Sequence, residues 1–495
     1  MYLIVKIFVI SLSAVVSAMV VIVLVRTLLH TPVDMPAVEP QTINIDEAAI
    51  AEHLAEAIRF RTVSHQRSEE FQADQFEGFI AWADATYPEV HQTMELSRHG
   101  DYTLLYRWQG SDPGLQPILL TAHYDVVPVI PGSETDWRHP PFAGVIDEDV
   151  IWGRGALDDK SAVIAQFEAA THLLRAGFTP QRTIYFSFGH DEEVGGSQGA
   201  GSVTSHLAAE GVQLAWSLDE GSFLLRGMLP GVEPLLAAIN VAEKGSVTLQ
   251  VVALSAGGHS SMPPKHTAVG ILAEAITKLE NNPVPGGLSG LSAQMFDTAS
   301  RYMSFSYRML FANQWLFGAI LEDQLSSVNF SNAMLRTTTA PTMLAGSVKV
   351  NVLPIEAIAT VNFRVHPRDT VASIVEHVRS LVESENVEVR LAAGSGRAAS
   401  AVSSWEAPGF AVIERAIREV YGEVVVTPGL MIAGSDSRHY GKVADNAYRF
   451  NPMVVSQDDI TGFHGTNEKI GVHNLAQGVR TYVRILTLGG TPRSG

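Results

Sequence analysis

Four short motifs rich in histidine and carboxylates follow predicted strands, and their residue types could together bind metal ions. The motifs are His123-Tyr124-Asp125, Gly153-Arg154-Gly155-Ala156-Leu157-Asp158-Asp159-Lys160, His190-Asp191-Glu192-Glu193 and Asp219-Glu220-Gly221. The apolar runs that precede them, each of strand length, are residues 117–122, 150–152, 183–189 and 214–218. In open α/β sheets the ligand site lies beyond the carboxyl ends of the strands, so we expect the four motifs to converge in one cleft.

Such a cleft suits a hydrolytic site with two metal ions. Two zinc ions about 3.5–4 Å apart need a bridging carboxylate, further carboxylate and imidazole ligands, and a water between them. Because a separate carboxylate must take the proton of that water, the adjacent Glu192 and Glu193 can divide the roles of base and ligand. An aspartate two residues beyond a ligand histidine, as Asp125 is to His123, can hold the ring and raise its basicity.

Each motif alone has an ordinary structural explanation. A single His-x-Asp is common, adjacent glutamates often occupy a solvated turn, and paired aspartates such as Asp158-Asp159 often cap a helix. These separate structural explanations do not account well for four such motifs at four strand ends with glycines beside them. The metal site is therefore the preferred interpretation.

Composition narrows the classes of protein. The 495 residues include 34 basic and 52 acidic side chains, a net charge of −18, which argues against binding of nucleic acid through Lys and Arg. There is no cysteine, so disulfides and thiolate zinc ligands are excluded and zinc must be held by His, Asp and Glu. The length favours two domains.

The segments around the motifs alternate between helix and strand patterns. Helical periods at residues 45–59 and 69–87 precede the strand-like runs, and those at 160–176 and 202–210 lie between them. This alternation predicts a mostly parallel sheet covered by helices, an α/β catalytic domain made of residues 46–241 and 399–495.

The inserted residues 242–398 have a different order of predicted helices and strands. Strand patterns at 247–254, 347–352, 358–365 and 387–392 and helical patterns at 268–279 and 370–384 give the order β-α-β-β-α-β. That order is typical of a ferredoxin-like α+β unit. Residues 281–342 interrupt it with aromatic-rich, helical sequence to which the residues themselves assign no role.

The N-terminus carries a membrane signal. Residues 7–25 form an uncharged run between Lys6 and Arg26, which as a helix would span roughly 28 Å, about the thickness of the bilayer core. We interpret residues 1–28 as a transmembrane signal anchor with the catalytic part outside the cytoplasm. The alternative is a cleaved signal peptide and a secreted enzyme. Residues 29–45, with three prolines, read as a semi-rigid linker.

Six ordered motifs resemble a known enzyme family. They are TAHYDVVP (121–128), WGRGALDDK (152–160), GHDEEVGG (189–196), LDEG (218–221), GGHSSMPP (257–264) and FHGTNE (463–468). They resemble the zinc metallopeptidase family of carboxypeptidase G, aminoacylase and succinyl-diaminopimelate desuccinylase, in particular its branch of carboxypeptidase S and N-fatty-acyl-amino-acid synthase/hydrolase. The resemblance extends from about residue 46 to 490.

The resemblance implies a ligand set for two zinc ions. His123 would bind one zinc, Asp158 would bridge the two, and Asp219 would complete the first set. Glu193 and His464 would bind the second zinc. Cobalt or manganese could replace zinc in such a site.

Two of these assignments have close competitors in the sequence. Glu220, next to Asp219, could be mistaken for the ligand. His439 and His473 lie near His464, which is chosen because it alone occurs in a His-x-x-Asn-Glu pattern.

The resemblance also implies roles for residues that bind no metal. Glu192 matches the general base, and Asp125 matches the residue that supports the first ligand histidine. The inserted unit resembles a lid that mediates dimerisation, whose His259 would stabilise the oxyanion, often across the dimer.

Three residues are candidates for holding a substrate carboxylate. The resemblance points to Asn351 and Arg364 in the lid, although Arg364 could equally be a surface charge on a strand. Arg438 is a further candidate, because a guanidinium gives planar, bidentate recognition of a carboxylate.

The expected function is therefore a di-zinc hydrolase that cleaves an amide bond beside a free carboxylate. Glu192 would act as the base on a water bridged by the two metals. The substrate would be a small peptide or an N-acyl amino acid, and the enzyme a homodimer. The rivals are a catalytically silent, membrane-tethered binding protein on the same fold and a desuccinylase or dipeptidase.

Overall fold

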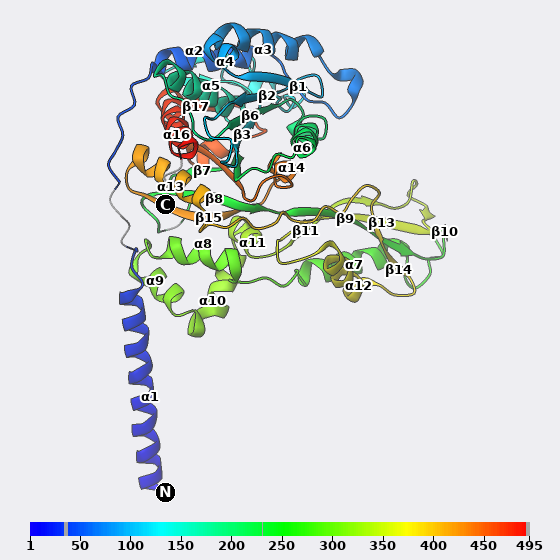
Figure 1. The fold of residues 1–495 in the computed structure, drawn as a ribbon. Coiled ribbons are helices and arrows are strands. Elements are labelled where there is room, and N and C mark those ends of the chain that lie inside the picture. The colour runs from blue at the N-terminus through cyan, green and yellow to red at the C-terminus, as the bar shows by residue number, and fades with distance from the viewer. Residues whose placement is uncertain (34–37, 230, 492–495) are drawn as a thin grey trace.

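The computed structural model describes residues 1–33, 38–229 and 231–491. The strands of its central sheet are β1 (Glu95–His99), β2 (Thr103–Trp108), β3 (Ile118–His123), β6 (Ile184–Gly189), β7 (Trp216–Leu225), β8 (Leu235–Glu243), β15 (Val424–Met431) and β16 (Ala447–Val455). They lie in the order β1-β2-β6-β3-β7-β16-β8-β15 (Figure 1). Because β3 pairs in parallel with β6 and β7, β7 with β16, and β8 with β15, the predicted mainly parallel sheet is confirmed.

Helices cover both faces of this sheet. The larger core lies against α2 (Glu47–Arg59), α3 (Ala73–Thr86), α4 (Pro88–Thr93), α5 (Lys160–Arg175), α13 (Pro408–Tyr421) and α16 (Val472–Gly490). A smaller core lies against α6 (Ala200–Ala209) and α14 (Ser437–Tyr440). Ile118 and Leu120 of β3 enter the first core and Leu119 enters the second. Burial on both faces explains why this strand is an unbroken apolar run.

Short elements complete the catalytic part. A three-stranded sheet has the order β17 (Lys469–Gly471), β5 (Val150–Trp152), β4 (Val145–Asp147). The remaining short helices are η1 (Ser68–Glu70), η2 (Glu134–Asp136), η3 (Glu192–Val194) and α15 (Gln457–Ile460).

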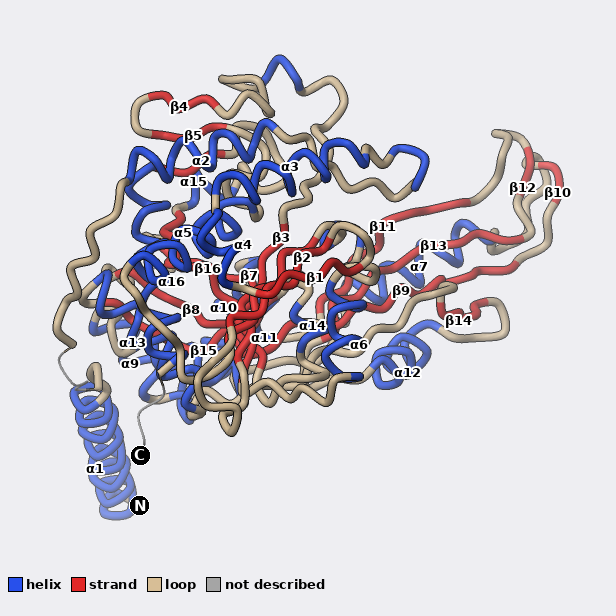
Figure 2. The backbone as a smooth tube through the Cα atoms, turned by 45° about the horizontal axis from the view of Figure 1, so that its top comes forward, coloured by secondary structure: helices blue, strands red, loops and turns tan. Residues whose placement is uncertain are grey.

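A second antiparallel sheet forms the lid. Its elements are β9 (Gly245–Leu254), α7 (Ala268–Asn281), β11 (Thr338–Ala345), β13 (Glu356–Val365), α12 (Val371–Val382) and β14 (Val387–Leu391), and its strand order is β11-β13-β9-β14. This is the predicted β-α-β-β-α-β sequence of elements, with its own apolar core. A short ribbon of β10 (Gly258–His259) and β12 (Val352–Leu353) lies at the end of the lid farthest from the central sheet (Figure 2).

One predicted lid strand was wrong. Residues 347–351 precede β12 as loop and turn, and Val348 and Val350 are fully exposed. The strand that pairs with β13 is instead β11, which contains Pro341 beside an irregularity in the register. Proline is tolerated at a bulge on an edge strand, and β11 is an edge strand.

The segment 281–342 is mostly helical, as predicted. It contains α8 (Gly290–Ser300), α9 (Phe305–Ala312), α10 (Gln314–Ser326) and α11 (Asn329–Leu335), and β11 begins at its end. These four helices are called the lid insertion below.

The N-terminal helix α1 (Tyr2–Leu29) projects from the body (Figure 1). Among the described residues it is the one helix long and apolar enough to cross a membrane, with a mean hydropathy of 2.9 over its most apolar stretch. Residues 34–37 of the predicted linker lie outside the described residues. Farther along the linker, the backbone N–H of Gln41 donates to the Glu419 carbonyl.

A buried ion cluster joins the lid to the central sheet. Glu243 ends β8 just before the lid begins, and one of its oxygens lies 2.7 Å from Arg397, where the chain returns from the lid. Its other oxygen accepts from Arg449 of β16 at 3.1 Å. The segment that enters the lid, the segment that leaves it and the central sheet thus meet at one carboxylate. The start and the end of the lid are therefore held together.

Candidate functional site

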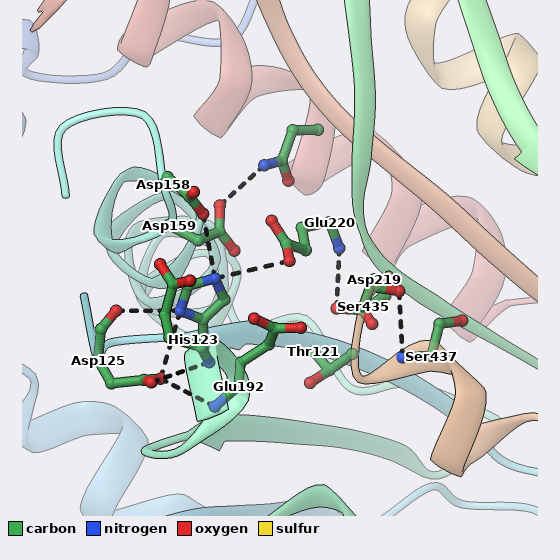
Figure 3. A network of polar contacts seen from close by, with 12 residues as sticks. Thr121, His123, Asp125, Asp158, Asp159, Glu192, Asp219, Glu220, Ser435 and Ser437 are labelled. Atoms are coloured by element: carbon green, nitrogen blue, oxygen red, sulfur yellow. Dashed lines mark hydrogen bonds and ion pairs between the residues drawn. The ribbon is translucent and has the colours of Figure 1, made fainter. Parts of the chain in front are cut away.

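Two histidines face opposite oxygens of one aspartate at the carboxyl ends of the sheet strands. The Nε2 atom of His123, the last residue of β3, lies 3.2 Å from Asp158 Oδ1 (Figure 3). The Nε2 atom of His464 lies 3.0 Å from Asp158 Oδ2. Asp158 thus has the position that a bridging carboxylate needs between two metal ions.

One further carboxylate joins each histidine. Glu220 Oε1 lies 3.6 Å from His123 Nε2, and Glu193 Oε2 lies 3.3 Å from His464 Nε2. The potential ligand atoms form two groups that share Asp158: His123, Asp158 and Glu220 in one, and Asp158, Glu193 and His464 in the other. Four of the five predicted metal-binding residues are therefore brought together.

Asp219, the fifth, is not in either group, and Glu220 takes its place. Successive side chains of a strand point to opposite faces, so Glu220 and Asp219 of β7 cannot both face His123. Asp219 Oδ1 accepts from the backbone N–H of Glu220 at 2.9 Å. In Figure 3 the Asp219 side chain lies beside Ser435, away from His123. The described geometry brings Glu220, rather than Asp219, within reach of His123, so Glu220 becomes the alternative to the predicted ligand Asp219.

Asp125 supports both the first histidine and the glutamate pair. Its backbone carbonyl lies 3.0 Å from His123 Nδ1, which leaves Nε2 facing the carboxylates. Its side chain accepts from the backbone N–H groups of Glu192 at 3.3 Å and Glu193 at 3.2 Å, and from the Ser64 hydroxyl at 2.6 Å. The Glu192 side chain points into the space beside His123 and Glu220 (Figure 3).

Glu468 holds the loop that carries Asp158, a role not recognised in the sequence. One of its oxygens accepts from the backbone N–H groups of Gly155, Leu157 and Asp158 at 2.8 to 3.0 Å. The other lies 2.6 Å from Arg154, and both of these charged side chains are buried. The signal was present in the motif FHGTNE, where Glu468 follows His464 by four residues.

The two competing histidines have other partners. His439 Nε2 lies 3.1 Å from the Gly195 carbonyl, and His473 pairs with Glu47 at the surface. His464 alone of the three lies with Asp158 and Glu193.

The electrostatics of the site favour a cation. Burial, strengthened by the charge of Glu220, raises the pKa of Glu192 well above its ordinary value. Burial and the charge of Asp158 likewise raise the pKa of Glu193, and they raise that of Glu220 to about 7. Since these carboxylates repel one another in a region shielded from water, a metal ion would relieve the repulsion and stabilise their ionised forms.

Unpaired buried atoms fit the same conclusion. His123 Nε2 and Glu193 Oε1 are buried and have no hydrogen-bond partner among the described residues. Buried polar atoms are normally paired, so both are free to serve as ligand atoms. The donor set of imidazole and carboxylate is one that zinc accepts.

The predicted lid residues lie in two separate places. His259 and Asn351 are neighbours in the β10–β12 ribbon, where the Ser260 N–H donates to the Asn351 carbonyl at 3.2 Å. This ribbon is far from β3 and β6 of the same chain (Figure 1). Arg364 is exposed at the other end of the lid sheet, opposite Ser246, the second residue of β9.

Arg438 lies closer to the acidic cluster. Its Nη2 atom is 3.7 Å from where a side chain on Gly195 would begin, and Gly195 follows the glutamate pair in the same turn. Gly195 has a φ of 111°, a conformation that side chains disfavour, so this turn and the approach of the guanidinium both suit glycine.

Residues 119–488 match the model of peptidase family M20/M25/M40. The chain belongs to this family. It is 39% identical over 448 residues to a probable carboxypeptidase S-like 2 of Dictyostelium discoideum, covering 89% of this chain and 85% of that protein. It is also 39% identical over 442 residues to an N-fatty-acyl-amino acid synthase/hydrolase of Mus musculus, covering 88% and 86%.

The fold agrees with that of solved members of the family. A crystal structure of an M20 family metallo-carboxypeptidase from Sulfolobus solfataricus matches with a TM-score of 0.63 and 17% identity, covering 90% of this chain and all of that one. The predicted family is confirmed, and the protein is a metallopeptidase or amidohydrolase of carboxypeptidase-like type. A metal site is compatible with the geometry described above.

The choice between Glu220 and Asp219 can be tested with matched substitutions. Glu220→Gln should lower the number of zinc ions retained per purified chain, because it weakens an oxygen donor beside His123. Asp219→Asn should retain as much zinc as the parent, since its carboxamide oxygen can still accept from the Glu220 N–H. Elemental analysis after dialysis against zinc-free buffer measures both. The opposite pattern would restore Asp219 as the ligand.

Proposed function

We propose that the protein is a di-zinc hydrolase that cleaves an amide bond next to a free carboxylate, as a carboxypeptidase or an N-acyl-amino-acid amidohydrolase. The observation that carries the proposal is the placement of Asp158 between His123 and His464, one oxygen toward each. His123, Asp158 and Glu220 would hold one zinc. Asp158, Glu193 and His464 would hold the other.

Glu192 is the proposed general base. Zinc bound in this site would lower the pKa of a water molecule and would polarise the scissile carbonyl. The Glu192 carboxylate takes the proton of the attacking water and passes it to the leaving nitrogen. Asp125 is a positioning residue, since it holds the backbone of Glu192 and accepts from it at 3.3 Å.

The proposed substrates are small peptides and N-acyl amino acids. The names of the relatives, carboxypeptidase S-like protein and N-fatty-acyl-amino acid synthase/hydrolase, support this class. Arg438, beside the glutamate turn, is the side chain of this chain that we assign to the substrate carboxylate, with Arg364 and Asn351 as lid candidates.

We further propose that α1 is a signal anchor that places the catalytic part outside the cytoplasm. Its length, its mean hydropathy of 2.9 and the exposure of nearly all of its side chains support a membrane span. Cleavage after this segment would release a secreted enzyme instead.

The lid would complete the site of a second copy in a homodimer. His259 is exposed on a ribbon far from the metal ligands of its own chain, so an oxyanion role for it requires a partner subunit (Figure 1). Residues 242–398 would then act as both lid and dimerisation domain.

A substrate screen tests the function. Blocked dipeptides and N-acyl amino acids should be hydrolysed, and the same compounds with an amidated C-terminus should not, because the amide lacks the anion that Arg438 binds. Chelator should abolish the activity and zinc restore it, with cobalt and manganese as comparisons. Release of the amino acid is measured. Hydrolysis of succinylated diamines alone would favour a desuccinylase, and hydrolysis of free dipeptides alone would favour a dipeptidase. Hydrolysis of none of these compounds would favour the silent binding protein.

Glu192→Gln should lower kcat by about 10²–10⁴-fold, because it removes the proton acceptor without removing a ligand. Its zinc content should stay at the parent level. Glu193→Gln is the matched control and should lose zinc as well as activity. Zinc loss in the Glu192 variant, with retention in the Glu193 variant, would exchange the two roles.

His259→Ala should lower kcat and kcat/KM together by about 10²–10³-fold, the usual effect of losing one oxyanion donor, with little change in zinc content. Mixing His259→Ala chains with Glu192→Gln chains should restore partial activity, because one site of each mixed dimer then has an intact base and histidine. Mixing is followed with differently tagged chains. Mixed dimers without recovered activity would contradict the role across subunits.

A further inference from the structure

The lid insertion holds the C-terminal end of the N-terminal helix. The α1 side chain Arg26 donates through Nε to the Ala312 carbonyl at 2.9 Å. Asn313, between α9 and α10, donates to the Val23 carbonyl at 3.2 Å and to the Thr27 hydroxyl at 3.3 Å. Figure 1 shows α9 and α10 beside this end of α1, on the side of the body toward which α1 projects.

The buried residues of α1 define where it leaves the protein. Val23 and Thr27 are buried, and their spacing places them on one face of the helix, and His30, directly after α1, is buried as well. Nearly all the residues before Val23 are exposed, although they are almost all apolar. The apolar length that would lie in a membrane therefore begins at the level of the lid insertion.

Large apolar side chains of the lid insertion are also exposed. They include Phe305, Tyr307, Trp315, Ile320, Val328 and Phe330, each at least 40% accessible to solvent. These side chains come from three successive helices and the turn before the last, α9 to α11. Soluble proteins seldom expose large apolar groups together unless they contact a partner or a membrane.

Basic groups lie where α1 meets the insertion. A cavity of about 500 Å³ there is lined by Arg26, Arg301 and Trp315, among others. Arg301 also pairs with Asp297 at 2.9 Å and donates to the Thr31 carbonyl at 3.2 Å. Arginine beside tryptophan is typical of the level of lipid headgroups, where the charge meets phosphate and the indole lies at the interface.

We propose that the lid insertion is an interfacial docking surface for the same bilayer that α1 crosses. Its exposed apolar side chains enter the boundary between headgroups and acyl chains, in the way of a monotopic amphipathic segment. The continuity with α1 identifies lipid as the occupant, because hydrogen bonds fix the insertion at the level where the apolar helix emerges. This inference rests on the proposed anchor and gives the lid a fixed attachment to the membrane.

The absence of cysteine allows a direct test on the full-length chain. Single substitutions Trp315→Cys and Phe330→Cys are spin-labelled, and the protein is reconstituted into vesicles of phosphatidylcholine and phosphatidylglycerol. Leu96→Cys, exposed on the edge strand β1 of the central sheet, is the control for water, and Val16→Cys, in the middle of α1, reports on the anchor. Power saturation compares the access of oxygen, which concentrates in lipid, with that of a polar nickel complex.

Labels at 315 and 330 should be more accessible to oxygen than to nickel, as at position 16, and the label at 96 should show the reverse. Water-like labels at 315 and 330 with a lipid-like label at 16 overturn the docking surface and leave the anchor intact. Labels shielded from both reagents identify a protein partner, such as a second copy, and also overturn it. A water-like label at 16 refutes the anchor and the docking surface that rests on it. Retained hydrolase activity in detergent verifies the fold of each variant.

Discussion

The mutual repulsion of buried carboxylates around Asp158 is the constraint on which the rest of the catalytic part depends. Glu192 and Glu193 of η3 and Glu220 of β7 are brought beside it, and burial raises the pKa of each of the three. A bound cation would stabilise the ionised form of such a cluster, and the two histidines that face Asp158 each direct a ring nitrogen toward it.

The supports are themselves buried carboxylates that accept backbone N–H groups. Glu468 holds the loop before α5, and Asp125 holds the turn of the glutamate pair. Each accepts hydrogen bonds from backbone N–H groups of a tight turn that would otherwise have no partner, and each thereby positions a predicted ligand or the proposed base. Asp125 thus links the first and third motifs, and Glu468 links the second motif to the segment that carries His464.

The lid is subject to a different constraint. The chain segments that enter and leave it must both lie beside the central sheet. Glu243 satisfies this by pairing with Arg397 and Arg449. At the opposite end, His259 lies far from the metal ligands of its own chain. The lid insertion lies on the other side, below the central sheet, where it contacts α1. One inserted unit therefore faces the catalytic sheet, a proposed partner subunit and a proposed membrane through separate surfaces.

The sequence by itself predicted the family, the parallel sheet and most of the site. Buried strands and the His and carboxylate motifs after them are local patterns, because strand ends in such a sheet converge whatever the loops do. The predictions from sequence were wrong where the structure depends on contacts between residues that are distant in the chain. The alternating valines at 347–352 resemble a strand, yet pairing with β13 is made by β11.

Tertiary structure alone decided between neighbouring candidates. Asp219 and Glu220 are both acidic, and only the face of β7 that each side chain occupies shows that Glu220 is the one that lies near His123. His464 is separated from His439 and His473 by its distance to Asp158. The contact between α1 and residue 313 likewise joins segments almost 300 positions apart, with 290 positions between Asn313 and Val23. Local periodicity carries no information on such pairings, because they are set by the packing of whole elements.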